Sequence, residues 1–127
     1  MKEFEKIGAN LKVLAVDDEP MNVKILQKML RHCGLDCEIA RDGVEAVEMA
    51  LNHDYDVILM DINMPRMDGV AAAQEIAKHL NPAGPQVIAV TANATSEMEQ
   101  ECAQAGFSGF IPKPVRLDQL RAVLAAA

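Results

Sequence analysis

Short runs of apolar residues alternate along this chain with longer segments in which apolar residues recur every three or four positions. The short runs are β-branched and nearly continuous, which is typical of strands buried on both faces. They predict strands near residues 12–16, 37–40, 56–60, 86–90 and 109–112. A strand followed by a helix, repeated along the whole chain, predicts an α/β fold: a parallel sheet with helices on both faces.

The intervening segments carry helix signals. The first helix should begin at Pro20 and end near Gly34, because proline suits a first helical position and glycine a C-terminal cap. Asp42 is a preferred N-cap for the second, with Glu45 three residues on, and a capping box at Ser96 should open the fourth. Apolar stripes indicate the other two helices: Ala73, Ile76, Ala77 and Leu80, and Leu117, Leu120, Val123 and Leu124.

Four predicted strands each end at residues that can handle phosphate or a metal ion. Asp17 and Asp18 follow the first strand, and Asp61 follows the third. Thr91 ends the fourth strand and Lys113 follows the fifth. Ligands of parallel α/β sheets bind beyond the carboxyl ends of the strands, so we expect one shared site there.

Composition narrows the class of protein. The chain has 127 residues, half of them hydrophobic, which predicts one globular domain. A formal net charge of −7 argues against nucleic acid as a direct partner. No apolar stretch approaches the roughly 20 residues that span a bilayer, and the start lacks a signal-peptide pattern. We therefore expect a cytoplasmic protein whose cysteines, Cys33, Cys37 and Cys102, only fill space in the core.

The acidic residues at the strand ends suit a hard cation. Adjacent carboxylates repel one another unless a cation neutralises them, although Asp18 or Glu19, beside Pro20 at a helix start, could also serve as an N-cap. With Asp61 added, Mg²⁺ is favoured, since it prefers oxygen ligands. Asp61 is then a candidate nucleophile for phosphorus, with Lys113 and Thr91 stabilising the phosphoryl oxygens.

Five segments carry a family resemblance: Val16-Asp17-Asp18-Glu19, Leu59-Met60-Asp61-Ile62-Asn63-Met64-Pro65, Met67-Asp68-Gly69, Ala89-Val90-Thr91-Ala92 and Lys113-Pro114. In this order and spacing the chain resembles receiver domains of two-component response regulators over residues 11–125. The resemblance implies a flavodoxin-like (βα)5 fold with strand order 2-1-3-4-5. Residues 1–10 look like a short lead-in, and the resemblance implies a receiver domain at residues 11–127.

The same resemblance implies roles for the acidic site. Asp61 would be the phosphoacceptor and form an aspartyl phosphate. Asp18, Asp61 and the backbone carbonyl of Asn63 would bind Mg²⁺ directly, and Asp17 would act through a metal-bound water. Lys113 would pair with the phosphoryl group or with Asp61.

A switch is implied as well. On phosphorylation the Thr91 hydroxyl would move inward and Phe110 would fill the vacated space. The signal would emerge on the surface formed by the fourth helix, the fifth strand and the fifth helix. The Lys113–Pro114 bond would be cis, and Gly69 would allow a tight turn.

The implied partners follow from that family. A histidine kinase or a histidine phosphotransfer protein would donate the phosphoryl group, and an unidentified output protein would receive the signal, with no nucleic acid and no direct membrane contact. We expect a monomer or a weak homodimer. Met1 and the lead-in favour a stand-alone protein, whereas Pro20-Met21-Asn22-Val23 and Thr91-Ala92-Asn93-Ala94 resemble receivers fused to hybrid sensor kinases.

Two other functions remain in view. A Mg²⁺-dependent phosphohydrolase could also use Asp61 covalently, but related phosphatases carry a general acid two residues later, where this chain has Asn63. A phosphorylation-independent interaction module would be marked by loss of Asp61 or Lys113, and both are present. We therefore expect a switch domain without a turnover substrate.

Overall fold

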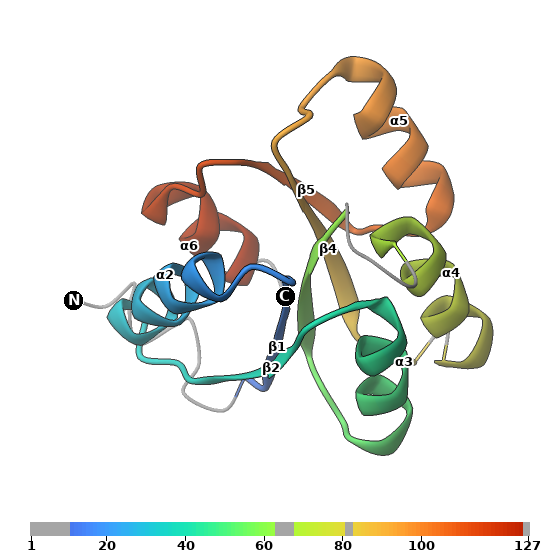
Figure 1. Ribbon diagram of the computed structural model, residues 1–127, viewed down its shortest axis with the longest axis horizontal. Coiled ribbons are helices and arrows are strands. Elements are labelled where there is room, and N and C mark those ends of the chain that lie inside the picture. The colour runs from blue at the N-terminus through green and yellow to red at the C-terminus, as the bar shows by residue number, and fades with distance from the viewer. Residues whose placement is uncertain (1–10, 63–67, 81–82, 126–127) are drawn as a thin grey trace.

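The computed structural model describes residues 11–62, 68–80 and 83–125. In these residues a five-stranded parallel sheet has the order β2-β1-β3-β4-β5, with helices on both faces (Figure 1), so the predicted α/β fold and strand order are confirmed. The strands are β1 (Val13–Val16), β2 (Cys37–Ala40), β3 (Val57–Asp61), β4 (Gln86–Thr91) and β5 (Gly109–Pro112). The helices are α2 (Pro20–His32), α3 (Gly43–Asn52), α4 (Gly69–Leu80), α5 (Ser96–Ala105) and α6 (Leu117–Ala125).

The sheet separates two hydrophobic cores. Successive side chains of a strand point to opposite faces, so each buried strand feeds both cores. One core joins the α3, α4 and α5 side and contains Leu14, Ile58 and Met60. The other joins α2 and α6 and contains Val13 and Leu59. Burial of such side chains stabilises the fold by about 1.5–3 kcal/mol each, which keeps the strand ends in fixed positions.

Helix ends agree with the sequence signals at α3 and differ at α5. The Asp42 side chain accepts a hydrogen bond of 2.8 Å from the Glu45 backbone N–H, as predicted. At α5 the predicted capping box at Ser96 is wrong, because the Thr95 hydroxyl accepts from the Met98 N–H at 3.0 Å and makes Thr95 the cap. Within the described ranges, no helix is long and apolar enough to cross a membrane.

Two strands extend one residue beyond their last apolar position. β3 includes Asp61, which pairs with Val90, and β4 includes Thr91, which pairs with Pro112. The ladder is made by backbone groups and does not depend on side-chain polarity, which is why apolar patterning ended these strands too early. As a result, both polar residues lie on rigid backbone at the carboxyl ends of their strands.

Helix α2 offers a matched test of the packing. Leu30 is 0% exposed and Ile25 is 49% exposed. We expect Leu30→Ala to lower the free energy of unfolding by about 2–5 kcal/mol, and Ile25→Ala to lower it by less than about 1 kcal/mol. Urea denaturation of both variants checks this, and equal losses would contradict the orientation of α2.

Candidate functional site

The carboxyl edge of the sheet gathers the acidic residues that the sequence singles out. Asp17 and Asp18 follow β1, and Asp61 ends β3. Asp17 and Asp61 are each 6% exposed, whereas Asp18 faces solvent. One carboxylate oxygen from each of the three lies within 4.8 Å of the others. Residues far apart in the sequence therefore form one acidic cluster, because β1 and β3 are neighbours in the sheet.

Lys113 connects two of these carboxylates. Its Nζ lies 3.2 Å from Asp17 Oδ2 and 3.3 Å from Asp61 Oδ1. Its backbone N–H donates a 2.8 Å hydrogen bond to the Thr91 carbonyl, which fixes the start of the loop after β5. The Lys113–Pro114 peptide bond is cis. The ammonium group thus supplies the positive charge that two buried carboxylates require.

The charges at the site affect the protonation of both Asp61 and Lys113. Burial raises the pKa of Asp61, and the charge of Asp17 raises it further, while Lys113 acts in the opposite direction. Burial alone would lower the pKa of Lys113, but the Asp61 and Asp17 carboxylates outweigh burial and hold that pKa above its ordinary value. The Asp17 and Asp61 carboxylates outnumber the single Lys113 ammonium, so a bound cation would be stabilised at this site.

Asp17 is fixed by the start of α2. Its Oδ1 accepts a hydrogen bond of 2.9 Å from the backbone N–H of Glu19. Glu19 is the N-cap residue of α2, and its own side chain makes no capping hydrogen bond. Of the two residues considered as caps, Glu19 and not Asp18 occupies the N-cap position. Asp17 presents its other oxygen to Lys113.

Thr91 and Phe110 lie on the same face of neighbouring strands. Thr91 is 1% exposed, and its hydroxyl oxygen accepts a 3.0 Å hydrogen bond from the backbone N–H of Asn93. Phe110 pairs with Ala89 in the ladder, and its half-buried ring packs against the α3–α4–α5 core. Ala89 and Thr91 are two residues apart and so share a face, which places Phe110 diagonally beside Thr91.

Two further predicted residues, Asn63 and Gly69, follow the end of β3. Asn63, expected to supply a backbone ligand, lies outside the described residues. Gly69, expected in a tight turn, is instead the first residue of α4. The described glycines with positive φ are Gly34 and Gly106. Gly69 therefore does not need the conformational freedom of glycine, and the reason for its identity must be steric.

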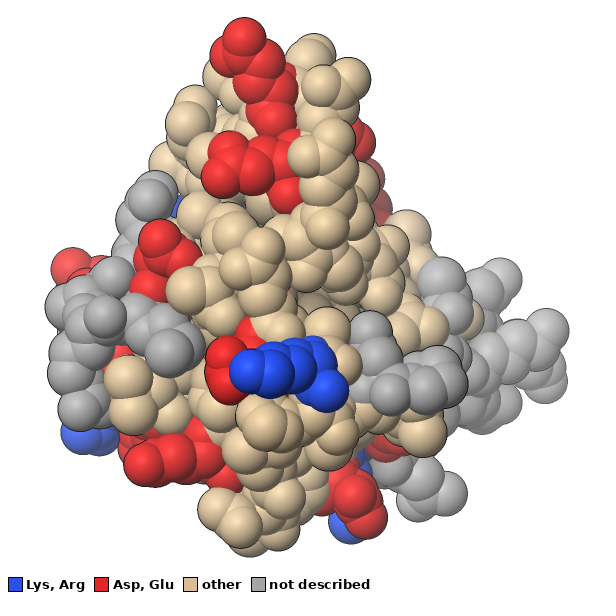
Figure 2. Space-filling view, turned by 90° about the vertical axis from the view of Figure 1, so that its right-hand side faces the viewer, with Lys and Arg blue, Asp and Glu red and all other residues tan. Residues whose placement is uncertain are grey.

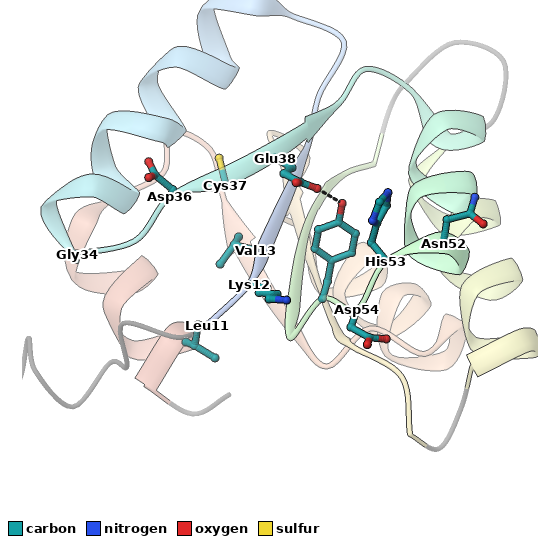
Figure 3. Close-up of a pocket in the computed structure, with 11 residues that line it drawn as sticks. Leu11, Lys12, Val13, Gly34, Asp36, Cys37, Glu38, Asn52, His53 and Asp54 are labelled. Carbon is teal, nitrogen blue, oxygen red and sulfur yellow. Dashed lines mark hydrogen bonds between the residues drawn. The ribbon is translucent and has the colours of Figure 1, made fainter.

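A second concavity lies at the opposite edge of the sheet. Its volume is about 650 Å³, and its walls come from the starts of β1 and β2 and from the loop between α3 and β3 (Figure 3). There the Tyr55 hydroxyl donates a hydrogen bond to the Glu38 carboxylate. None of the acidic cluster or Lys113 lines this cavity, so it is separate from the candidate site.

Comparison with known proteins assigns the chain to a family. The model of the response regulator receiver domain matches residues 13–125, and the chain belongs to that family. It is therefore a phosphoacceptor signalling domain of two-component systems. The chain is 40% identical over 116 residues to the sensor histidine kinase RcsC of Salmonella typhi. The aligned residues cover 91% of this chain and 12% of that protein. It thus spans only a small part of this much longer relative.

Solved structures agree with this assignment. The receiver domain of sensor histidine kinase PA1611 from Pseudomonas aeruginosa PAO1 was solved with a magnesium ion coordinated in its active-site cleft. It matches with a TM-score of 0.83 and 35% identity, covering 91% of this chain and 95% of that one. A chain of the CheX–CheY–BeF3–Mg complex from Borrelia burgdorferi matches with a TM-score of 0.87 and 28% identity, covering 98% of each.

Removal of the Asp61 charge should change the pH dependence of stability. Because the pKa of Asp61 is raised on folding, the folded state binds the proton more tightly, and stability falls as pH rises from 3.8 through the raised value. Asp61→Asn cannot ionise and escapes this loss. Without divalent metal at pH 7 we expect the variant to unfold at a higher urea concentration, with the difference narrowing toward pH 4.

The exposed Asp54 provides the control for this pH series. Asp54→Asn should leave the urea midpoint nearly unchanged at both pH values, because Asp54 lies at the opposite edge of the sheet. An Asp61→Asn variant that is less stable than the unaltered chain at pH 7 would contradict the electrostatic account.

Proposed function

We propose that Asp61 is the phosphoacceptor and that its donor is a phosphohistidine on a histidine kinase or a histidine phosphotransfer protein. An Asp61 carboxylate oxygen forms the new bond to phosphorus, and the bond from phosphorus to the donor's imidazole nitrogen breaks. The imidazole leaves with that electron pair and takes up a proton from solvent. The observation that carries the proposal is the buried Asp61 carboxylate beside Lys113 and within 4.8 Å of the Asp17 and Asp18 oxygens.

Mg²⁺ fits the donor set of this site. Asp17, Asp18 and Asp61 supply oxygen ligands of the kind that Mg²⁺ prefers, and bound Mg²⁺ would neutralise charge on the phosphoryl oxygens. The magnesium ion in the PA1611 receiver supports this assignment. Lys113 can follow the transferred group as a mobile charge, since its ammonium already contacts Asp61. The Thr91 hydroxyl can donate a hydrogen bond to a phosphoryl oxygen.

The surface of α2 suits a protein donor. Met21 is 63% exposed and Ile25 is 49% exposed, so α2 presents two large apolar side chains to solvent. A mainly apolar groove of about 370 Å³ runs from Ile25 to Lys113 and Asp17. Contact here would bring a donor histidine to the mouth of the acidic cluster. The domain needs no turnover substrate, because the acceptor is its own side chain.

The proposed switch links Thr91 to Phe110. When the Thr91 hydroxyl turns to the phosphoryl group, it gives up its hydrogen bond from the Asn93 N–H, and Phe110 moves into the vacated volume. The readout surface would be α5, β5 and α6. Acidic side chains gather over α5 at the top of Figure 2, where this helix carries Glu97, Glu99 and Glu101. An output partner with basic groups would complement this surface.

We assign these roles to residues 11–127 as one phosphoacceptor unit. The match to this chain covers 12% of the RcsC sequence, which is compatible with a unit that works within a longer chain. The proposal therefore concerns the chemistry of the receiver domain, and the donor and output proteins are identified only by class.

Intact-mass spectrometry tests the acceptor directly. Incubation with acetyl phosphate and Mg²⁺ should add a single phosphoryl group to the unaltered chain and none to Asp61→Asn. Chelation of Mg²⁺ should abolish the adduct. A variant with Asp56→Asn, which changes a carboxylate at the other edge of the sheet, should still be labelled. Labelling of Asp61→Asn to the same extent as the unaltered chain would place the acceptor elsewhere.

Replacement of Phe110 separates phosphorylation from its readout. Phe110→Ala removes a half-buried ring that packs against the α3–α4–α5 core and leaves Asp61 and Lys113 in place, so the rate of labelling by acetyl phosphate should stay close to that of the unaltered chain. The phosphorylation-induced shifts of α5 and α6 amide resonances in NMR spectra should become much smaller. Full-size shifts in the variant would remove Phe110 from the switch.

A further inference from the structure

We propose that Gly69 is a positioning residue for the acceptor: the absence of a side chain lets the first turn of α4 rest on the Asp61 peptide group and fix the Asp61 carboxylate. This inference rests on the proposed role of Asp61 and adds a residue that does not itself touch phosphate or metal.

The contact is between backbone atoms. A Cβ built on Gly69 would lie 2.2 Å from the Asp61 carbonyl oxygen, 2.9 Å from Ile62 Cα and 3.0 Å from the Asp61 carbonyl carbon. Ordinary contact begins at 3.4 Å, so any side chain would have to push the two segments apart by about 1 Å. A flexible side chain could rotate away, but a peptide group in this position cannot.

The α4 side of this contact is held in place. The Gly69 N–H donates a 2.7 Å hydrogen bond to the Ile62 carbonyl. Ala72 and Ile76, one and two turns later in α4, are buried against the core at 0% and 1% exposure. A displacement therefore cannot be absorbed by free movement of α4, because that movement would expose a packed helix face.

The less restrained side is the end of β3. Asp61 is paired with Val90 in the ladder, but beyond it the Ile62 N–H reaches the Val90 carbonyl only at 3.3 Å. Pressure on the Asp61 carbonyl would thus turn the Asp61 Cα, from which the carboxylate extends. The 3.3 Å contact with Lys113 and the cluster with Asp17 depend on that direction.

Gly69→Ala tests this inference, and Gly84→Ala is its matched control. Neither glycine has positive φ, so each substitution adds crowding without backbone strain. At Gly84 the new Cβ would meet Leu80 Cβ at 2.7 Å, just beyond the other end of α4. Both variants should lose stability in urea. The purified full chain is used, with Mg²⁺ and acetyl phosphate as probes, at a temperature where each variant is folded.

Only Gly69→Ala should damage the site. We expect its Mg²⁺ dissociation constant to rise by roughly 10–100-fold, the range seen when groups behind metal ligands are lost. The labelling rate at saturating Mg²⁺ should fall by up to about 100-fold, since a misplacement of 1 Å can cost that much. Gly84→Ala should stay within about twofold of the unaltered chain in both quantities.

Equal Mg²⁺ affinity and labelling rate in the two folded variants would overturn the inference. If Gly69→Ala does not fold, NMR of the unaltered chain decides: Mg²⁺ should shift the Gly69 amide strongly and slow its hydrogen exchange, with the Gly84 amide as reference. A Gly69 amide that responds no more than that of Gly84 would also overturn it. If the unaltered chain binds Mg²⁺ but is not labelled, the proposed function fails, while the comparison of Mg²⁺ affinities still tests Gly69.

Discussion

The candidate site depends on one ammonium group placed between two buried carboxylates. Asp17 and Asp61 stand at the ends of neighbouring strands, where burial and mutual repulsion would make two full negative charges costly. Lys113 reaches both from the loop after β5, at 3.2 and 3.3 Å. The fold provides rigid strand ends, and the positive charge of Lys113 offsets the cost of burying two carboxylates there. The same arrangement leaves net negative charge, which favours binding of a divalent cation.

Much of the fold could be predicted from the sequence because its signals are local and agree with one another. Buried β-branched runs alternate with helical spacing, and Asp42 with Glu45 marks a helix start through neighbouring residues alone. The strand order was available only through family resemblance, since the pairing of β1 with β3 joins distant segments. Local signals also misplaced the α5 cap by one residue, because Thr95 and Ser96 are both good N-cap residues.

The sequence predicted which residues gather at the site but not which of them contact one another. Parallel strands bring their carboxyl ends to one edge, so Asp61 and Asp17 could be grouped before any distance was known. That Lys113 contacts Asp17 as well as Asp61 follows from side-chain reach, which no spacing encodes. Gly69 is a sharper case: the sequence suggested a turn, and only the structure reveals a steric demand set by the Asp61 peptide group. Packing between segments distant in sequence carries this information.

Tyr55 has a consequence for how the molecule can be observed. The chain has one tyrosine and no tryptophan, so all of its tyrosine fluorescence comes from a single ring. That ring is 9% exposed, bonded to Glu38, and located at the sheet edge opposite the acidic cluster. Tyrosine emission will therefore report when this domain unfolds while remaining nearly blind to events at Asp61. An optical probe of phosphorylation needs a fluorophore introduced on the other side of the sheet.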